Sequence, residues 1–538
     1  MTAILSFEGA DTAPDQLERR AQKLAGGLHE LGLRAGDVVA VLLRNDPVYV
    51  DIMLACRLGG FQFCPLNWHF TPSELAHIVE DCGAKAAIGH TDLLEAACSA
   101  LSDGLTVLAV PHGGSGAPGA GADGRPLSPD GGRTLPHGPG QALPHGPGQA
   151  LAYGCGQVLP YESWLEQQEP YSGPLESPGG HMVYTSGTTG RPKGVVRTPV
   201  PVAEADAFRT RMLAVIEQVH GLRAGCRALL TAPLYHSAPS MYAQYGALVA
   251  GLLVIAPRFD AEQTLALVER HRIDTLYCVP TMYVRLLKLP REVRERYDLS
   301  SLRFVGSTGA PCAPEVKKAM IDWLGPIVHE TYASSETGYI TLIDSAEALA
   351  RPGSVGRPLG DAQIRVVGDD GEECAPGEVG NLYVRQPAHT DFTYRGRPEA
   401  REEVGLDGLV SVGDMGYLDE DGYLYVCDRA VDMVISGGVN IYPAEIEAAL
   451  LILPGVLDCA VFGVPDAEFG ERLHAFVLPE PGAAPDPAEL RDALRATLAG
   501  FKIPRGVDLV TDLPRDPNGK LAKHRIRARY LETASGRP

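Results

Sequence analysis

The segment from Tyr184 to Gly194 concentrates residue types that bind oxyanions. It contains four hydroxyl residues, three glycines and two cations: Thr185, Ser186, Thr188, Thr189, Gly187, Gly190, Gly194, Arg191 and Lys193. Glycine lets backbone N–H groups approach an anion closely, hydroxyl groups donate hydrogen bonds, and the cations supply charge. A solvated turn needs far fewer such residues, so the segment predicts a phosphate-binding loop. It is not a Walker A loop, because no Gly-Lys-Ser/Thr triplet ends it.

Further polar segments follow along most of the remaining chain. They are 233–237 (PLYHS), 307–311 (STGAP), 332–338 (YASSETG), 413–414 (GD), 428–447 and 514–520 (PRDPNGK). Taken in order with the loop after Tyr184, they resemble the signatures of the adenylate-forming superfamily, which includes acyl-CoA synthetases, firefly luciferase and nonribosomal-peptide adenylation domains. The resemblance implies an acyl-CoA synthetase, which uses ATP to activate a carboxylic acid to an acyl-adenylate, releases pyrophosphate and then transfers the acyl group to CoA.

The resemblance also implies which residues bind ATP and AMP. The phosphate loop supplies Thr185, Ser186, Gly187, Thr188, Thr189 and Gly190. The adenine side comprises Gly309, Ala310 and Pro311, with Tyr332 offering a flat face to the base and Ser335 retaining a hydroxyl where Thr is more usual. Asp414 is expected to accept hydrogen bonds from both ribose hydroxyls, and Arg429 to donate to the same sugar.

Three charged residues are expected to be catalytic: Lys520, Glu336 and Lys193. Attack of a carboxylate on the α-phosphate brings two anions together, so cations must be concentrated at this point. By resemblance, Lys520 bridges the carboxylate and the α-phosphate. Mg2+ prefers phosphate oxygens together with one or two carboxylates, and this preference suits Glu336 as the metal ligand.

Two further groups of residues are implied for the acid and for the thiol. The acyl pocket is expected to include His236, Ser237, Tyr283 and Ser307, and the tunnel for CoA to include Ser436, Gly437 and Gly438. No Arg or Lys lies beside Ser237 in the run 237–240 (SAPS). This composition favours an apolar acyl or aryl acid over a dicarboxylate or an amino acid.

Some positions depart from the family pattern and keep alternatives open. Val431 stands where Asp or Lys is usual after the hinge arginine, and Ala333 stands where Gly is commoner. An adenylate-forming enzyme that passes the acyl group to a carrier protein or another nucleophile is therefore the first alternative. The second is a non-catalytic nucleotide-binding relative. A P-loop NTPase would instead release inorganic phosphate without any acid.

The elements that must position these residues follow an α/β rhythm. Apolar residues from Leu17 to Leu31 recur at helical spacing, the run 38–43 predicts a buried strand, and helices and short apolar runs continue to alternate to about Asp428. We expect a large N-terminal body of parallel or mixed sheets flanked by helices over 1–428, a hinge at 429–432 and a small mobile α+β domain over 433–538. A Gly/Pro-rich insertion at about 113–160, with tandem LPHGPGQA repeats, predicts a surface loop.

Composition agrees with an enzyme that acts on small molecules. Of 538 residues, 45% are hydrophobic, and the net charge of -20 disfavours binding to nucleic acid. The 11 cysteines are scattered, and no apolar run reaches the roughly 20 residues of a membrane span. We expect a cytoplasmic protein without a membrane span whose partners are a carboxylic acid, ATP and CoA. A homodimer is compatible with the sequence.

Overall fold

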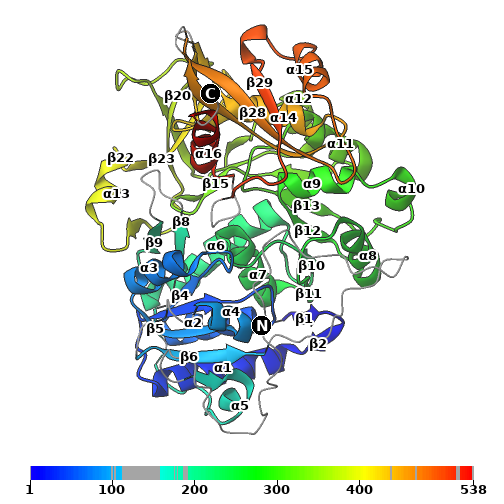
Figure 1. Ribbon diagram of the computed structural model, residues 1–538. Helices are drawn as coiled ribbons and strands as arrows, with labels where there is room; N and C mark the ends of the chain where they lie inside the picture. Colours follow the sequence, from blue (N-terminus) through cyan, green and yellow to red (C-terminus); the bar gives the residue numbers. More distant parts are fainter. Residues whose placement is uncertain are drawn as a thin grey trace.

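The computed structural model describes residues 2–97, 101, 104–111, 158–174, 176–177, 180–185, 192–436, 439–466, 469–515 and 521–535 (Figure 1). Most of the predicted Gly/Pro-rich insertion at 113–160 lies outside the described residues. Its last three residues differ from the prediction. Val158–Pro160 forms strand β7, which pairs in parallel with β6 (Thr106–Val110) at the edge of a sheet.

Two largely parallel sheets form the N-terminal body. The larger has the order β14-β13-β12-β10-β11-β1-β2, and the smaller has the order β4-β3-β5-β6-β7. The larger sheet contains β1 (Ile4–Phe7), β2 (Ala10–Thr12), β10 (Arg227–Leu230), β11 (Leu252–Ile255), β12 (Thr275–Cys278), β13 (Phe304–Ser307) and β14 (Val328–Glu330). The smaller adds β3 (Val38–Leu42), β4 (Gln62–Pro65) and β5 (Ala84–His90). One continuous hydrophobic core joins residues from both sheets and confirms the predicted α/β class.

Local sequence explains several of these elements. Strand β3 (VVAVL) is buried at every position, as expected for a parallel strand covered on both faces. Helix α1 (Pro14–Glu30) starts with proline in its first turn and buries the face that includes Leu17, Leu24 and Leu28. Helix α3 (Pro72–Cys82) begins at a capping box formed by Thr71 and Glu74.

Antiparallel strands link the body to the C-terminal domain. The hairpin of β8 (Met182–Thr185) and β9 (Lys193–Arg197) is extended by β21 (Phe392–Tyr394). A second sheet has the order β19-β20-β23-β22, with β24 paired to β23. Its strands are β19 (Gln363–Val367), β20 (Gly380–Arg385), β22 (Gly405–Leu406), β23 (Leu409–Leu418) and β24 (Leu424–Arg429).

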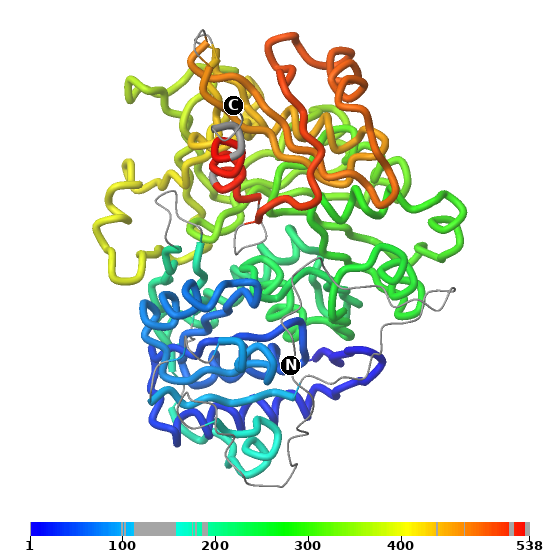
Figure 2. Tube along the Cα trace, viewed as in Figure 1, coloured from blue at the N-terminus to red at the C-terminus, as the bar shows by residue number. Residues whose placement is uncertain are grey.

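The C-terminal domain has its own sheet and its own core. The sheet consists of β25 (Val434–Ser436), β26 (Val439–Ile441), β27 (Val456–Asp466), β28 (Gly470–Pro479) and β29 (Gly506–Leu509). Helices α14 (Pro443–Leu451), α15 (Pro487–Arg495) and α16 (Lys523–Ser535) accompany it. Two clusters of buried apolar residues belong to this domain alone. It lies at the opposite end of the molecule from the N-terminal strands (Figure 2).

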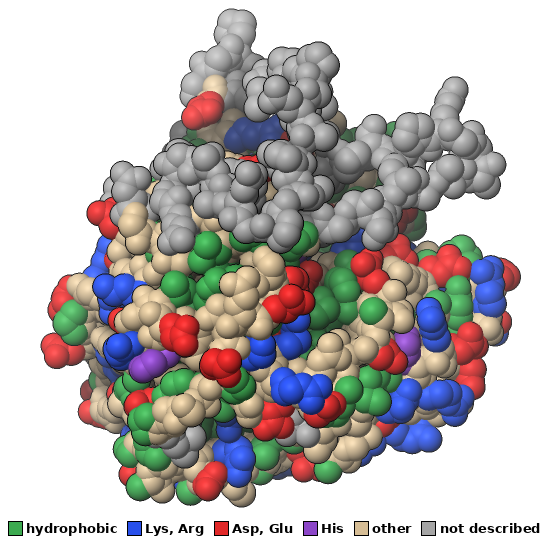
Figure 3. Space-filling view, turned by 90° about the horizontal axis from the view of Figure 1, so that it is seen from below, with side chains coloured by type: hydrophobic (Ala, Val, Ile, Leu, Met, Phe, Trp, Pro, Cys, Tyr) green, Lys and Arg blue, Asp and Glu red, His purple; other side chains and the backbone are tan. Residues whose placement is uncertain are grey.

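Ion pairs connect the two parts. Lys288, which follows α9 (Pro280–Leu287), pairs with Glu480 at 2.6 Å, and Arg525 of α16 pairs with Glu74 at 3.0 Å. Seen from below, acidic and basic side chains are intermingled on the surface of the N-terminal body (Figure 3). Among the described residues, no helix has the length and apolarity needed to cross a membrane.

Candidate active site

One large cleft runs between the body and the C-terminal domain. Its volume is about 2950 Å³, and both parts of the chain line it. Most of the described residues predicted for the site lie on its wall: Thr185, Lys193, His236, Ser237, Gly309, Ala310, Pro311, Tyr332, Ser335, Glu336, Asp414 and Arg429. Residues separated by more than 200 positions in the sequence therefore meet in one cavity.

The base of the predicted phosphate loop is a strand hairpin. Thr185 ends β8 and is the register partner of Lys193, which begins β9. The Thr185 hydroxyl donates to Oε1 of Glu336 over 3.4 Å, and Lys193 Nζ lies 5.2 Å from the centre of the Tyr394 ring. Burial, and after it the Glu336 charge, raises the pKa of Tyr394 above its ordinary value. Glu336, the predicted metal ligand, and Lys193, the predicted catalytic cation, thus both lie near Tyr394.

Arg197 positions the segment that carries Ser335 and Glu336. Its guanidinium donates to the Ser335 carbonyl at 2.7 Å and to the Thr390 carbonyl at 3.0 Å. Burial lowers its pKa to about 10, so the side chain is still charged at neutral pH. Neither Arg197 nor Tyr394 is among the site residues predicted from the sequence. The sequence did contain a pattern that points to Arg197. Side chains alternate between the two faces of a strand, so Arg197, four residues after Lys193, lies on the same face as Lys193.

The residues predicted to bind the ribose and the adenine interact with one another. Tyr332 donates from its hydroxyl to Oδ2 of Asp414 at 2.5 Å, and Arg429 Nε lies 3.8 Å from Oδ1 of the same carboxylate. Asp414 and Arg429 face each other across β23 and β24. Burial, followed by the Asp414 charge, raises the pKa of Tyr332 well above its ordinary value, so the hydroxyl keeps its proton. The loop 309–311 lines the cleft beside them, and Gly309 has a φ of 91° that favours glycine.

Helix α7 (Ser237–Val249) carries the predicted acyl-pocket residues that reach the cleft. His236 is its N-cap, and the Ser237 hydroxyl lies 3.2 Å from that of Ser335. The structure does not bring Tyr283 and Ser307 to the cleft. Tyr283 is 0% exposed and Ser307 2% exposed, and both lie behind its wall. Other residues of α9, including Thr281, Val284 and Arg285, line the cleft, while Tyr283 packs into the core.

Apolar side chains from two helices continue this wall. Phe208 and Met212 come from α6 (Ala205–His220), and Met241 and Tyr245 come from α7. We call these four residues, with Arg57 of α2 (Val48–Gly59), the acid side of the cleft. The nucleotide side comprises Thr185, Lys193, Tyr332, Glu336, Asp414 and Arg429. Ser237 and Ser335 meet where the two sides join.

Several predicted residues lie outside the described part of the chain. They are Ser186, Gly187, Thr188, Thr189, Gly190, Gly437, Gly438 and Lys520. Described residues on either side of Lys520 do reach the site, since Arg515 and Leu521 line the cleft. Ser436 is described and ends β25, but it is not among the residues that line the cleft.

The donor set of the cleft suits a hard cation held mainly by phosphate. No group of three or more His, Cys, Asp or Glu side chains that could hold a metal is present among the described residues. Glu336 supplies a carboxylate close to the phosphate-loop hairpin, which fits Mg2+ bound through one protein carboxylate and the substrate phosphates.

This fold and this cleft define a class of protein: a large α/β body and a small C-terminal domain with a cleft between them, on whose wall the residues predicted to bind a nucleotide lie. Residues 2–391 match the family model described as AMP-binding enzyme, and residues 445–520 match the AMP-binding enzyme C-terminal domain. The chain belongs to this adenylate-forming family, which confirms the resemblance, and it is an enzyme of the AMP-forming acid–thiol ligase type.

Relatives span the whole chain. A feruloyl-CoA synthase from Amycolatopsis sp. is 35% identical over 522 residues, 96% of this chain and 93% of that protein. The fatty acid–[acyl-carrier-protein] ligase ScoC from Streptomyces coeruleorubidus is 30% identical over 539 residues, 98% of this chain and 93% of that protein. The ATP-bound structure of MatB from Rhodopseudomonas palustris has a TM-score of 0.76 and 27% identity, covering 99% of this chain and 96% of that one.

Proposed function

We propose that the enzyme couples an aryl or apolar carboxylic acid to CoA through an acyl-adenylate. In the first step a carboxylate oxygen attacks the α-phosphorus of ATP, the bond to the bridging oxygen breaks, and pyrophosphate leaves. In the second step the thiol sulfur of CoA attacks the acyl carbonyl, loses its proton, and AMP leaves. The observation that carries the proposal is the junction of the two sides of the cleft at Ser237 and Ser335.

The nucleotide side is proposed to act as follows. Asp414 and Arg429 orient the ribose, Tyr332 flanks the adenine, and the loop at 186–190 holds the phosphates. Lys193 and Lys520 neutralise charge where the two anions meet. Glu336 would hold Mg2+, which supplies charge neutralisation on the phosphates when bound.

The C-terminal domain is proposed to serve both steps in turn. It would comprise residues 433–538 and rotate about a hinge at 429–432, withdrawing Lys520 and bringing Ser436, Gly437 and Gly438 beside the path of the thiol. Val431 in this hinge is 63% exposed, which leaves its apolar side chain free of packing that would oppose rotation.

The nature of the acid side supports an aryl or apolar substrate. Phe208, Met212, Met241 and Tyr245 present mainly carbon to the cleft, and the feruloyl-CoA synthase relative is named for an aryl acid. The similarity to ScoC favours one second candidate, in which the acceptor is the thiol of an acyl-carrier protein.

A panel of carboxylic acids, scored for pyrophosphate release with and without CoA, tests the proposal. We expect acid-dependent release with an aryl acid and formation of its CoA thioester. Release without thioester formation would support the carrier-protein candidate. Absence of release with every acid would overturn the proposed function.

A further inference from the structure

Arg57 is an unusual member of the wall because none of the described residues forms a hydrogen bond or ion pair with its side chain. The residue lies in the last turn of α2, is only partly exposed and lines the cleft. Across the described residues, its guanidinium takes part in no hydrogen bond, ion pair or cation–π contact. A guanidinium with five donors that is partly removed from water is unfavourable unless an acceptor satisfies it.

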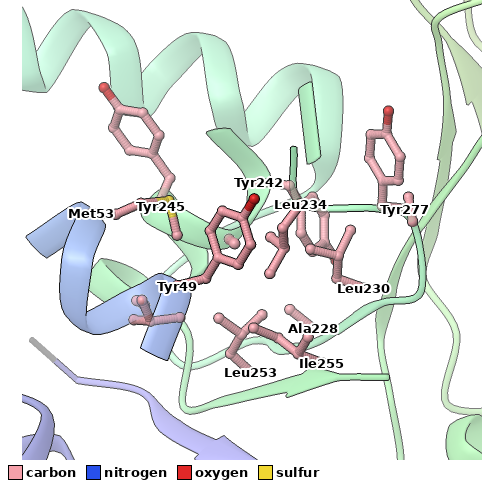
Figure 4. Close-up of a cluster of buried hydrophobic side chains, with 14 of the residues drawn as sticks. Tyr49, Met53, Ala228, Leu230, Leu234, Tyr242, Tyr245, Leu253, Ile255 and Tyr277 are labelled. Atoms are coloured by element: carbon pink, nitrogen blue, oxygen red, sulfur yellow. The ribbon is translucent and has the colours of Figure 1, made fainter. Parts of the chain in front are cut away.

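The neighbours of Arg57 do not supply this acceptor. Tyr245 of α7 is 5% exposed, and its hydroxyl points away from the surrounding apolar side chains (Figure 4). Both residues line the cleft, on helices that pack against each other. Burial raises the pKa of Tyr245 to about 12, while the charge of Arg57 opposes the increase. The Asp206 carboxylate, whose charge acts on Arg57, is 92% exposed and pairs with Arg209 at 3.0 Å. The Arg209 charge also acts on Arg57, with the opposite sign. Arg57 and Tyr245 thus place polar groups beside the apolar Phe208, Met212 and Met241, on a wall that also includes Arg209 and Gln244.

Helix geometry gives the length of this wall. Ser237, at the junction with the nucleotide side, and Tyr245 are separated by eight residues of α7. At the usual helical rise this separation is about 12 Å along the helix axis. Helix α2 packs against α7, and the charge of Arg57 acts on Tyr245, so we assign Arg57 to the Tyr245 end of the wall. An aryl acid with a short linker between ring and carboxylate spans most of this length.

We infer that Arg57 and Tyr245 bind an oxygen atom at the end of the acid remote from its carboxylate. The substrate class is then an aryl acid whose ring carries an acceptor oxygen, as a hydroxyl or a carboxylate, in the position opposite the acyl chain. Arg57 donates to this oxygen, and Tyr245 adds a second hydrogen-bonding group. This inference rests on the proposed function, because it names the substrate of the same cleft.

Four acids that differ only in the ring substituent test the inference: cinnamic acid with 4-methyl, 4-methoxy, 4-hydroxy or 4-carboxy substitution, of which the methyl and hydroxy acids match in length. The full-length wild-type enzyme should show a kcat/KM for pyrophosphate release that is about 10- to 100-fold higher with the better oxygen-bearing acid than with the methyl acid, the scale of a hydrogen bond to a charged group. The hydroxy and carboxy acids distinguish a phenol from an anionic carboxylate, and the methoxy acid shows whether an acceptor alone suffices.

Variants assign the preference to the two residues. Arg57→Met should reduce the ratio of oxygen-bearing to methyl acid to the few-fold that the Tyr245 hydrogen bond supports. Arg57→Lys should restore part of the ratio, and Tyr245→Phe should lower it by a smaller factor than Arg57→Met. Arg211→Met, on the exposed side of α6 and away from the cleft, is the matched control and should keep the wild-type ratio. The ratio is insensitive to a loss of folded protein, because both acids report on the same sample.

The outcomes of these experiments distinguish a failure of the role inferred for Arg57 from a failure of the proposed function. An equal kcat/KM for the methyl and oxygen-bearing acids in the wild type, or an unchanged ratio in Arg57→Met, would overturn the role of Arg57 and leave the acid–thiol ligase activity standing. No pyrophosphate release with any carboxylic acid, including acids outside this set, would overturn the proposed function itself.

Discussion

The two sides of the cleft differ in how their polar groups are satisfied. On the nucleotide side the groups hold one another: Tyr332 donates to Asp414, Arg429 pairs with the same carboxylate, and Thr185 donates to Glu336. On the acid side Arg57 makes no such interaction with any described residue. If the two sides bind the ligands proposed for them, the nucleotide side is organised before its ligand binds, whereas on the acid side the ligand supplies the acceptor for Arg57.

This difference has a consequence for specificity. A nucleotide is common to every turnover, so its binding groups can be fixed by the protein. The acid is the variable partner, and an unpaired donor discriminates between acids that supply an acceptor and acids that do not. Changes on the nucleotide side should then alter the rate with all acids by one factor, and changes on the acid side should alter the ratio between acids.

The largest effect is expected from Lys520. Lys520→Ala should slow acyl-adenylate formation by a factor of about 100 to 1000, the scale of one lost charge-stabilising donor, and by the same factor with each acid. Pyrophosphate release in single turnovers measures this step. Thioester formation from supplied acyl-adenylate is the control and should persist. Equal losses in both steps would contradict the assignment of Lys520 to the first step alone.

Asp414 is expected to have the next largest effect. Asp414→Asn removes the charge that organises Tyr332 and Arg429, and should raise the KM for ATP by about 10- to 100-fold, the range of a hydrogen bond involving a charged group. Steady-state kinetics with ATP varied at saturating acid measure the change. Tyr332→Phe keeps the ring and should give a smaller increase. A change confined to the KM of the acid would contradict the division between the two sides.

The stability of the fold is expected to depend on pH through a buried histidine at the end of α6, the helix that supplies Phe208 and Met212 to the acid side. His220 ends α6 and lies 2.8 Å from the Tyr339 hydroxyl, and burial lowers its pKa from 6.5 to about 3. Between these pH values the unfolded chain binds a proton that the folded chain excludes. The stability contributed by the neutral imidazole is thus complete above pH 6.5 and is lost as the pH falls toward 3.

His220→Phe should remove this part of the pH dependence, which amounts to about 2 kcal/mol between pH 6.5 and 5. Urea unfolding of both proteins at the two pH values measures the difference. The buried His181 and His389 also have lowered pKa values and contribute equally to both proteins, so they cancel in the comparison. Identical pH dependence in wild type and variant would show that His220 does not titrate in this range.

Much of the secondary structure could be predicted from the sequence, because it depends on local patterns of apolar residues. The α/β class and most elements follow from periodicity, and the predicted helix at Leu17–Leu31 and strand at 38–43 correspond to α1 and β3. The ends of strands are harder to predict from the sequence. The segment 422–426 (GYLYV) does not show where strand β24 (Leu424–Arg429) ends, because pairing with β23 extends the strand through two polar residues. Tertiary pairing of this kind leaves no local pattern.

Some site residues could likewise be predicted from local motifs, whereas others are placed only by the packing of helices. Asp414, Glu336 and Arg429 stand in local motifs and could be predicted to share the cleft. Arg57 stands in an apolar helix far from every motif, and only the packing of α2 against α7 brings it to the wall. Tyr283 was expected in the acyl pocket by correspondence alone, but the direction of its side chain depends on how α9 packs, which places it in the core.

The smallest effect is expected at the junction of the two sides. Ser237→Ala removes a hydrogen bond between neutral hydroxyls that links α7 to the Ser335 segment, while Arg197 continues to hold the Ser335 carbonyl. We expect kcat/KM for pyrophosphate release to fall by about 2- to 10-fold, the range for one neutral hydrogen bond, with the ratio between acids preserved. Ser240→Ala, in the same helix but bonded to the Leu234 carbonyl, separates a loss of helix anchoring from a loss of the junction. If Ser237→Ala changed the ratio between oxygen-bearing and methyl acids as much as Arg57→Met, discrimination would arise at the carboxylate end, and the distal end would not be the source of specificity.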